Sequence, residues 1–313
     1  MTFQHEPVLV EPVLELLQPR PGGHYLDGTV GGGGHAAALL TAAPDAHLLG
    51  LDQDDEALAA AAARLAPFGD RVTLRRARYS TMAEVAHQLG WNQVDGILLD
   101  IGVSSHQINT PIRGFAHRFD GPLDMRMDRR QSLTASGLLN HTSEEELARI
   151  FRDYGEEPRA RALAHAVAVR RREAPWERTG ELAELAAAVC GGHQRSLPGA
   201  TRAFQALRIA VNDELGELER GLRAAHDLLA PGGRLAVISF HSLEDRLVKN
   251  FFRDAAAACL CPPGLPECRC GKVVTLHVVT RKPIFARPAE LAANPRSAPA
   301  RLRVAERLPP RKG

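Results

Sequence analysis

The sequence predicts an α/β fold in which a doubly wound, Rossmann-like parallel sheet is interrupted once by an all-helical segment. First, short apolar strands alternate with helical segments at both ends of the chain, which is typical of a parallel sheet covered by helices. Second, no convincing strand occurs between about Thr110 and Asn212, where capped helices follow one another. We therefore expect a discontinuous domain of residues 1–109 and 213–313, and a helical insertion of residues 110–212 that binds the substrate.

The first hundred residues supply four of the expected strands. The last of them is nearly all apolar, as a strand buried on both faces should be. Asp54 and Ser80 are the expected N-caps of two of the intervening helices. The expected strands are residues 24–27, 47–52, 72–77 and 94–100, and the expected helices are residues 34–43, 54–66 and 80–89.

The first clear helix signal in the insertion is a capping box at Ser143 and Glu146. It predicts a helix that ends at Gly155. A second helix carries Leu163, and a third is capped by Thr179. After the insertion, apolar residues in register from Phe204 to Leu222 predict one long helix.

Alternation then resumes and completes a sheet of about seven strands. A helix is expected from Ser242, and a Pro-rich connection joins the last two strands. The three expected strands are residues 234–240, 273–280 and 300–308.

Composition and charge narrow the function classes. The chain has 313 residues, of which 44% are hydrophobic and 24% charged, and this excludes a disordered protein. No apolar run approaches the ~18 residues of a membrane span, and no signal peptide is visible, so we expect a cytoplasmic protein without a membrane partner. Residues 281–313 carry nine Lys/Arg against two Glu. Such a tail can contact phosphates, and a merely solvated tail is the alternative.

A glycine-rich turn, Asp27-Gly-Thr-Val-Gly-Gly-Gly-Gly-His35, joins the first strand to the first helix. Glycines there let the backbone approach a ligand, although a purely structural tight turn would look similar. Asp52 ends the second strand, where a carboxylate can accept the ribose hydroxyls of a nucleoside cofactor. Together these features predict an adenosine-containing cofactor.

The residue before the glycines helps to choose that cofactor. Gly31-x-Gly33-x-x-Ala36 fits a dinucleotide motif loosely, so a nicotinamide cofactor stays an alternative. A carboxylate at Asp27 would repel a pyrophosphate, but it suits the ammonium group of S-adenosyl-L-methionine (SAM).

Two further side chains follow strands on the same rim. Asp100 ends the fourth strand and His241 follows the fifth, so we expect both at the edge of the sheet where the ligand binds. The alternative is that Asp100 only caps a loop and that His241 makes ordinary loop contacts.

Five long motifs, in the same order over nearly the whole chain, resemble the bacterial 16S ribosomal RNA cytosine-N4-methyltransferases (the RsmH, or MraW, family). They are Asp27–His35, Leu98–Gln107, Gly121–Asp128, Thr201–Ile209 and Ile238–Arg246. This resemblance implies a seven-stranded class I SAM-dependent methyltransferase that modifies N4 of a specific cytidine in the decoding region of 16S rRNA, within the 30S subunit. No DNA partner is expected. His106 stands where the family often has proline, which affects the expected shape of that loop.

The resemblance also implies which residues bind SAM. They are Gly33, Gly34, His35, Asp52, Tyr79, Asp100 and Gln107. Tyr79 follows the third strand, beside the expected adenine pocket, with core packing as its alternative role.

Methylation of cytosine N4 needs a proton acceptor, because the amine lone pair is conjugated into the ring and the nitrogen loses a proton as the C–N bond forms. Asp100 is the first candidate for that acceptor and His241 the second. The base must leave its stack, and three aromatic residues could flank it: Phe240, Phe115 and Phe119.

Basic residues of the insertion could hold the RNA, although arginines on helix surfaces are usually only solvated. They are Arg126, Arg129, Arg130, Arg159, Arg161, Arg170, Arg171, Arg172, Arg202 and Arg208. A non-catalytic ribosome-assembly factor with the same fold is an alternative, which the intact Asp27, Asp52 and Asp100 disfavour.

Four of the five cysteines cluster in the sequence as Cys259, Cys261, Cys268 and Cys270. Paired thiolates on a constrained loop are typical of structural zinc sites, but reduced thiols are an equal alternative. A disulfide is less expected in the cytosol. The sequence alone therefore assigns no metal ligand.

Overall fold

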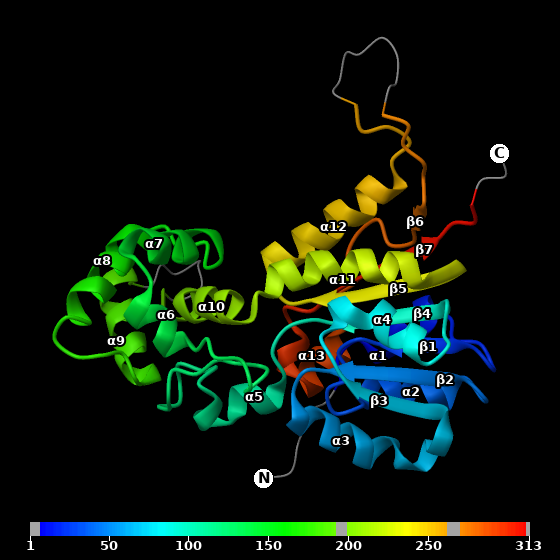
Figure 1. Cartoon of the computed structure of the whole chain (residues 1–313), viewed down its shortest axis with the longest axis horizontal. Helices are drawn as coiled ribbons and strands as arrows, with labels where there is room; N and C mark the ends of the chain where they lie inside the picture. Colours follow the sequence, from blue (N-terminus) through cyan, green and yellow to red (C-terminus); the bar gives the residue numbers. More distant parts are fainter. Residues whose placement is uncertain (1–6, 192–198, 262–269, 311–313) are drawn as a thin grey trace. The chain divides into compact units, whose positions relative to one another are not determined.

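The computed structural model describes residues 7–191, 199–261 and 270–310, and the chain divides into two compact units (Figure 1). The first unit consists of residues 1–102 and 215–313, and the second consists of residues 103–214. Among the described residues, no helix combines the length and the apolar character needed to cross a membrane.

The first unit contains a seven-stranded sheet in the order β3-β2-β1-β4-β5-β7-β6, which confirms the predicted class I methyltransferase fold. Strands β3, β2, β1, β4 and β5 are parallel, and β7 runs antiparallel between β5 and β6. The strands are β1 (His24–Asp27), β2 (His47–Asp52), β3 (Val72–Arg76), β4 (Val94–Asp100), β5 (Leu229–Ser239), β6 (Leu276–Val278) and β7 (Arg301–Arg307).

Helices cover both faces of this sheet, as apolar strands such as β4 require. On one face α1 (Val10–Leu17), α2 (Gly34–Ala42) and α3 (Asp55–Leu65) pack over residues such as Leu48 and Leu98. On the other face α4 (Met82–Gln88), α11 (Glu214–Leu228) and α12 (Ser242–Ala256) pack over Leu99 and Val237. Outside these layers lie the short helix α13 (Pro288–Ala293) and three 3-10 turns, η1 (Ala66–Arg71), η2 (Tyr79–Thr81) and η4 (Pro295–Ser297).

The second unit is helical, and every named strand lies in the first unit. Its core gathers Leu139, Phe151, Trp176 and Phe204, all buried. Ser143 caps α7 by accepting a hydrogen bond from the Glu146 N–H, as its capping sequence predicts. The helices are α5 (Ser105–Asn109), α6 (Ala135–His141), α7 (Glu144–Asp153), α8 (Ala160–Arg170), α9 (Thr179–Cys190) and α10 (Gly199–Asn212), with a 3-10 turn η3 (Pro111–Arg113).

The predicted single helix from Phe204 to Leu222 is wrong. The chain forms two helices, α10 and α11, because Asp213 between them adopts the left-handed conformation with φ of 51°. A non-glycine residue in this conformation cannot continue a right-handed helix.

Two smaller expectations also need correction. The helix expected from Ser80 begins only at Met82, after the turn η2. Helices α1 and α13 were not predicted, and α13 lies in the Pro-rich connection. Strand β7 confirms the strand expected at residues 300–308, so this part of the basic segment belongs to the sheet and is not a solvated tail.

Candidate active site at the carboxyl edge of the sheet

The sheet has its switch point between β1 and β4. The chain leaves β1 towards β2 and β3 and then returns to β4 on the other side of β1. In open α/β sheets, ligands bind outside the carboxyl ends of the strands at such a point. Strands β1, β2 and β4 end in Asp27, Asp52 and Asp100, the three aspartates that the sequence analysis selected as candidate site residues.

The glycine loop after β1 is packed tightly against β4. The Gly28 N–H donates to the Leu98 carbonyl at 2.9 Å, and a Cβ on Gly28 would lie 2.5 Å from Leu99 Cδ2. Gly33 caps α2 in the left-handed conformation, with φ of 76°. The predicted Gly33, Gly34 and His35 therefore stand at the first turn of α2, whose N-terminal amides are suited to a polar ligand.

Asp52 holds the glycine loop to the end of β2. Its Oδ2 accepts from the Gly31 N–H at 3.0 Å, and its Oδ1 accepts from the Asp54 N–H at 2.9 Å. Burial raises the pKa of Asp52 to about 6, against the opposing effect of these N–H donors. Asp54 caps α3, as predicted, so Asp52 is not needed as a cap. Each oxygen of Asp52 has a second lone pair that can accept a ribose hydroxyl.

Asp27 is 3% exposed and lies beside Asp52. Burial raises the pKa of Asp27 to about 7, and the negative charge of Asp52 adds to the rise. Thr29 joins the ends of two strands, since its N–H donates to Asp27 Oδ1 and its Oγ1 accepts from the Asp100 N–H at 2.6 Å.

Asp100 has the most strongly perturbed carboxyl group of the three. Burial raises the pKa of Asp100 to about 8, with further contributions from the negative charges of Asp27 and Glu244. Within the described part of the chain, its Oδ1 is buried and has no hydrogen-bond partner. Buried polar atoms normally have partners, so this oxygen indicates a place for a ligand.

His35 faces Asp100 from the first turn of α2, with Nδ1 3.7 Å from Asp100 Oδ2. Its Nε2 lies 2.8 Å from the Val8 carbonyl. A carbonyl oxygen only accepts, so Nε2 carries a proton. Nδ1 therefore presents a lone pair to Asp100 in the neutral ring and an N–H in the imidazolium.

Glu244 is a site residue that the sequence reasoning missed. It is 2% exposed, and its Oε2 accepts from the backbone N–H groups of Phe240 and His241 at the start of α12. Its position three residues after His241 is the signal of a capping box that could have identified it. The ring of His241 is largely buried, with Nε2 3.0 Å from Glu244 Oε1 in a geometry outside that of a hydrogen bond.

Tyr79 borders the glycine loop and packs on α11. A Cβ on Gly221 would lie 2.4 Å from its ring, and a Cβ on Gly28 would lie 2.9 Å from its own Cβ. The ring thus rests where both glycines leave room.

Gln107 belongs to the second unit, where its side chain caps α5. Its Oε1 accepts from the Ser104 N–H at 2.9 Å, and its own N–H donates to Ser104 Oγ. The other predicted SAM-binding residues lie in the first unit, and the contact of each of them with SAM, like that of Gln107, stays a prediction.

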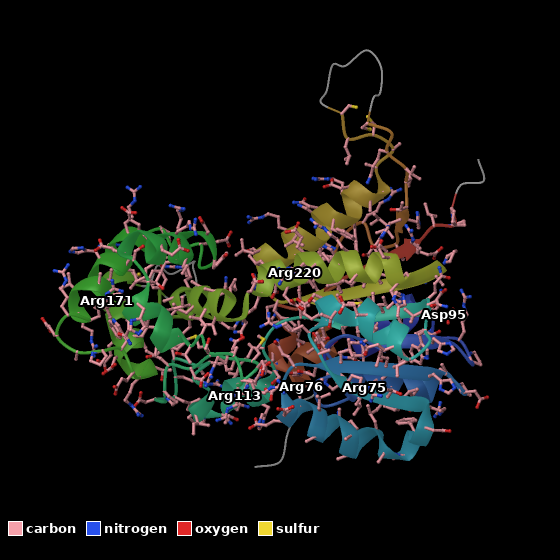
Figure 2. The ribbon with its side chains drawn as sticks, viewed as in Figure 1. Arg75, Arg76, Asp95, Arg113, Arg171 and Arg220 are labelled. Carbon is pink, nitrogen blue, oxygen red and sulfur yellow. The ribbon has the colours of Figure 1, made fainter. Side chains whose placement is uncertain are left out.

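Several arginines predicted to contact RNA instead hold the second unit together. Arg202 pairs with the buried Glu157 at 2.6 Å. Arg171, labelled in Figure 2, donates to the carbonyl oxygens of Leu139 and Thr142. Arg126 binds Asp124, Arg208 binds Glu214, and Arg170 stacks on Trp176. Phe115, proposed beside the target base, is buried in the core of the same unit.

Other arginines of the second unit remain exposed at its surface. Arg152, Arg159 and Arg161 line a hollow of about 470 Å³ beside α7 and α8, and Arg172 is exposed after the end of α8.

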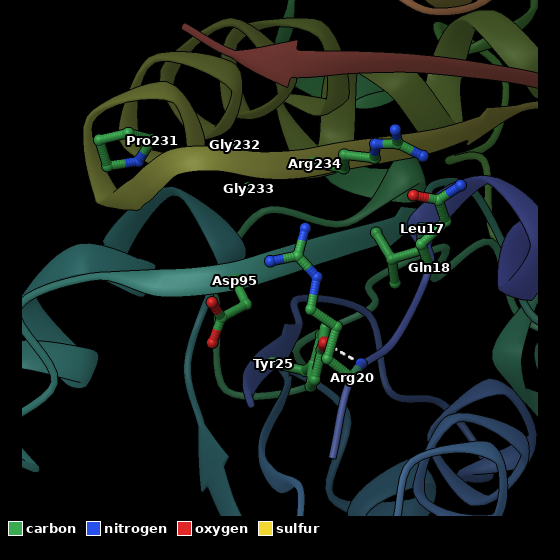
Figure 3. Close-up of a pocket in the computed structure, with 9 residues that line it drawn as sticks. All are labelled: Leu17, Gln18, Arg20, Tyr25, Asp95, Pro231, Gly232, Gly233 and Arg234. Atoms are coloured by element: carbon green, nitrogen blue, oxygen red, sulfur yellow. Dashed lines mark hydrogen bonds between the residues drawn. The ribbon is translucent and has the colours of Figure 1, made fainter. Parts of the chain in front are cut away.

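A second, much smaller pocket lies at the opposite edge of the sheet, where β1 and β4 begin (Figure 3). Tyr25 and Asp95 line it, and the Tyr25 hydroxyl accepts from the Arg20 N–H at 2.7 Å. Its volume of about 20 Å³ suits roughly one water molecule, so it is not the cofactor site.

Comparison with known proteins decides the family, since the model of the MraW methylase family matches residues 2–308. The chain belongs to this family. It is a SAM-dependent methyltransferase, and the nicotinamide alternative is excluded.

Relatives of similar length share about half of its residues. Ribosomal RNA small subunit methyltransferase H of Heliobacterium modesticaldum is 55% identical over 98% of this chain and 100% of its own length. The protein of the same name from Symbiobacterium thermophilum is also 55% identical, over 98% of both chains. A putative methyltransferase from Streptococcus mutans, solved in complex with SAH, is 11% identical over 96% of this chain and 95% of its own, with a TM-score of 0.41. This last likeness is too weak to carry an argument.

The residues at the carboxyl edge fit SAM. Asp27, Asp52, Asp100 and Glu244 place four largely buried carboxyl groups at this edge, while SAM carries a sulfonium and an ammonium group. A bound cation would favour the ionised carboxylates and would lower the pKa values that burial raises.

Proposed function

We propose that this enzyme transfers the methyl group of SAM to N4 of one cytidine in the decoding region of 16S rRNA, within the small ribosomal subunit in the cytoplasm. The names of its relatives support ribosomal RNA of the small subunit as the substrate. The observation that carries the chemistry is the buried Oδ1 of Asp100, which lacks a partner among the described residues.

The residues around the glycine loop bind and orient the cofactor. Asp52 would accept hydrogen bonds from the ribose hydroxyls, Tyr79 would pack on the adenine, and Asp27 would face the ammonium group. When bound, SAM supplies an electrophilic methyl group on its sulfonium sulfur.

Asp100 accepts the proton that N4 must lose. The C–N bond forms as the C–S bond breaks, and the proton passes from N4 to Oδ1, which leaves N4-methylcytidine and S-adenosylhomocysteine. Burial raises the pKa of Asp100 and so makes its carboxylate a stronger base, and the positive charge of bound SAM would favour the ionised form that accepts a proton. His241 is the second candidate, because its ring nitrogens are buried and have no hydrogen-bond partner among the described residues.

The second unit binds the RNA through phosphates. Its exposed Arg159, Arg161 and Arg172 supply positive charge and, within the described part of the chain, do not make internal contacts of the kind that Arg171 and Arg202 make. The charge of Arg152 is offset by its ion pair with Asp153. An assembly factor without activity would have no use for three buried carboxylates at the switch point, so we favour the enzyme.

Nucleoside analysis tests the proposal. Small subunits that lack the modification are incubated with the protein and labelled SAM, and their rRNA is then digested to nucleosides. We expect the label in N4-methylcytidine alone, at close to one methyl group per subunit. Subunits that already carry the modification serve as the control and should take up none. Label in any other nucleoside would refute the proposed acceptor atom.

A further inference from the structure

Three cysteines meet in the connection between α12 and β6, far from the strand ends that form the candidate active site. The Sγ atoms of Cys259, Cys261 and Cys270 all lie within 4.8 Å of one another. Cys268, the fourth cysteine of the sequence cluster, lies outside the described residues, and the inference does not depend on it.

One pair of sulfur atoms has the separation expected in a metal centre. Cys259 Sγ and Cys270 Sγ are 3.8 Å apart. Zinc–thiolate bonds are about 2.3 Å long, so two sulfur atoms in a tetrahedral zinc site are separated by roughly 3.8 Å. This separation is far longer than the bond of a disulfide, which is about 2.05 Å.

Backbone groups around the cluster support thiolates. The Cys261 N–H donates to Cys259 Sγ at 3.3 Å, an interaction that stabilises a negatively charged sulfur and fixes its direction. Gly271 follows Cys270 with φ of 57°, a conformation that lets the chain turn immediately after the ligand.

The described flanks of this connection have little regular structure and few buried side chains. Residues 257–261 and 270–275 contain no helix or strand, and Leu260 and Val273 are about half exposed, at 51% and 52%. Figure 1 shows both flanks extending beyond the end of α12. At the base, the Thr275 N–H donates to the Ala255 carbonyl. In the described flanks, where apolar side chains such as Leu260 and Val273 are exposed, a structural metal would supply order that burial does not.

We propose that Cys259, Cys261 and Cys270 bind one structural zinc ion that orders the connection between α12 and β6. Thiolates select soft or borderline metals, and zinc with a tetrahedral sulfur-rich shell is the usual structural choice. Methyl transfer from SAM needs no metal, so this site is independent of the proposed reaction.

Metal analysis of the purified full-length protein tests the inference. Wild-type protein from zinc-supplemented medium, purified with a reductant and without chelator, should contain about one zinc ion per chain by mass spectrometry of the elements. The double variant Cys259→Ser/Cys270→Ser should lose it. Cys190→Ser is the matched control and should keep it, because Cys190 is buried on α9 in the second unit.

A second measurement uses wild-type protein alone, so it does not depend on how the variant folds. Replacement of zinc by Co²⁺ should give the absorption of tetrahedral cobalt together with a thiolate-to-cobalt charge-transfer band. Chelation should speed amide hydrogen exchange in residues 257–261 and 270–275 and leave exchange in β4 unchanged. Metal-free wild-type protein, zinc that persists in the double variant, iron in place of zinc, or cobalt spectra without thiolate bands would each overturn the proposal.

Discussion

Burial decides the chemistry of the aspartates that end β1, β2 and β4. In water each would be ionised at neutral pH, but in the first unit the pKa values of Asp27 and Asp100 are raised to about 7 and about 8. Without a cation beside them, part of the population of these groups is protonated at pH 7. A cation placed beside these groups would favour their ionised forms.

These raised pKa values predict how stability depends on pH. A carboxyl group whose pKa is raised by folding binds its proton more tightly in the folded state, so stability falls as pH rises from about 4 to about 8. Asp100→Asn removes one such group without changing its shape. The variant without SAM should gain at least about 1 kcal/mol over the wild type at pH 8 and little at pH 4.5. Urea unfolding at the two pH values measures this difference, and an equal effect at both would show that Asp100 is ionised in the folded protein at both.

Much of this site could be predicted from the sequence. Carboxyl ends of parallel strands share one edge, so Asp27, Asp52 and Asp100 had to lie near one another once β1, β2 and β4 were recognised. The bond from His35 to the Val8 carbonyl and the burial of Glu244 could not be predicted, because both depend on packing between distant segments.

Helix α11 and the turn η2 pack closely where Gly221 faces the ring of Tyr79. A Cβ on Gly221 would lie 2.4 Å from the Tyr79 ring, so this ring lies closer to α11 than any other residue type at position 221 would allow.

Gly221→Ala should therefore destabilise the protein although alanine favours a helix by about 1 kcal/mol. Overpacking costs about 1–3 kcal/mol, and the ring of Tyr79 must move away from the glycine loop. We expect lower stability in urea and weaker SAM binding by calorimetry. Gly137→Ala on α6 is the control, since its Cβ would meet only Thr134 Oγ1 at 3.4 Å. If Gly221→Ala were as stable as this control and bound SAM normally, Tyr79 would have no role in the pocket.

Elements with a strong local signal were predicted well. The boundaries of β4 are those expected, because its sequence is nearly all apolar and five of its seven residues are buried. The break between α10 and α11 was missed, since the apolar register continues across Asp213 and only its backbone conformation shows the interruption. The inner position of β7 was missed for a related reason. The charged residues of this segment suggested that it is exposed to solvent, but Arg303 is largely buried and paired with Asp245 at 2.6 Å.

Across the whole chain, the charged side chains are distributed differently between the two units. The first unit collects carboxylates at one edge of its sheet, and the second unit exposes arginines. Binding of RNA through phosphates releases counterions and so weakens steeply with salt, whereas binding of a small cofactor in a buried pocket does not.

The triple variant Arg159→Gln/Arg161→Gln/Arg172→Gln should bind the RNA substrate more weakly and with a shallower salt dependence. The slope of log affinity against log salt concentration should become shallower by about 2. Each contact between an arginine and a single-strand phosphate contributes roughly 0.7 to this slope, and the variant removes three arginines. SAM affinity should not change. Arg75→Gln serves as the control, because Arg75 is exposed on β3 in the first unit (Figure 2). An unchanged salt slope in the triple variant would mean that the RNA is held elsewhere.

The most direct test of the account is the single-turnover rate of Asp100→Asn at saturating SAM, with the modification-free small subunit as substrate. If Asp100 accepts the proton from N4, the rate should fall by about 10²–10⁴, the usual contribution of acid–base assistance, while calorimetry shows SAM binding largely retained. An unchanged rate in this folded variant would contradict the account, since it would remove Asp100 from the reaction and leave His241 as the acceptor to test.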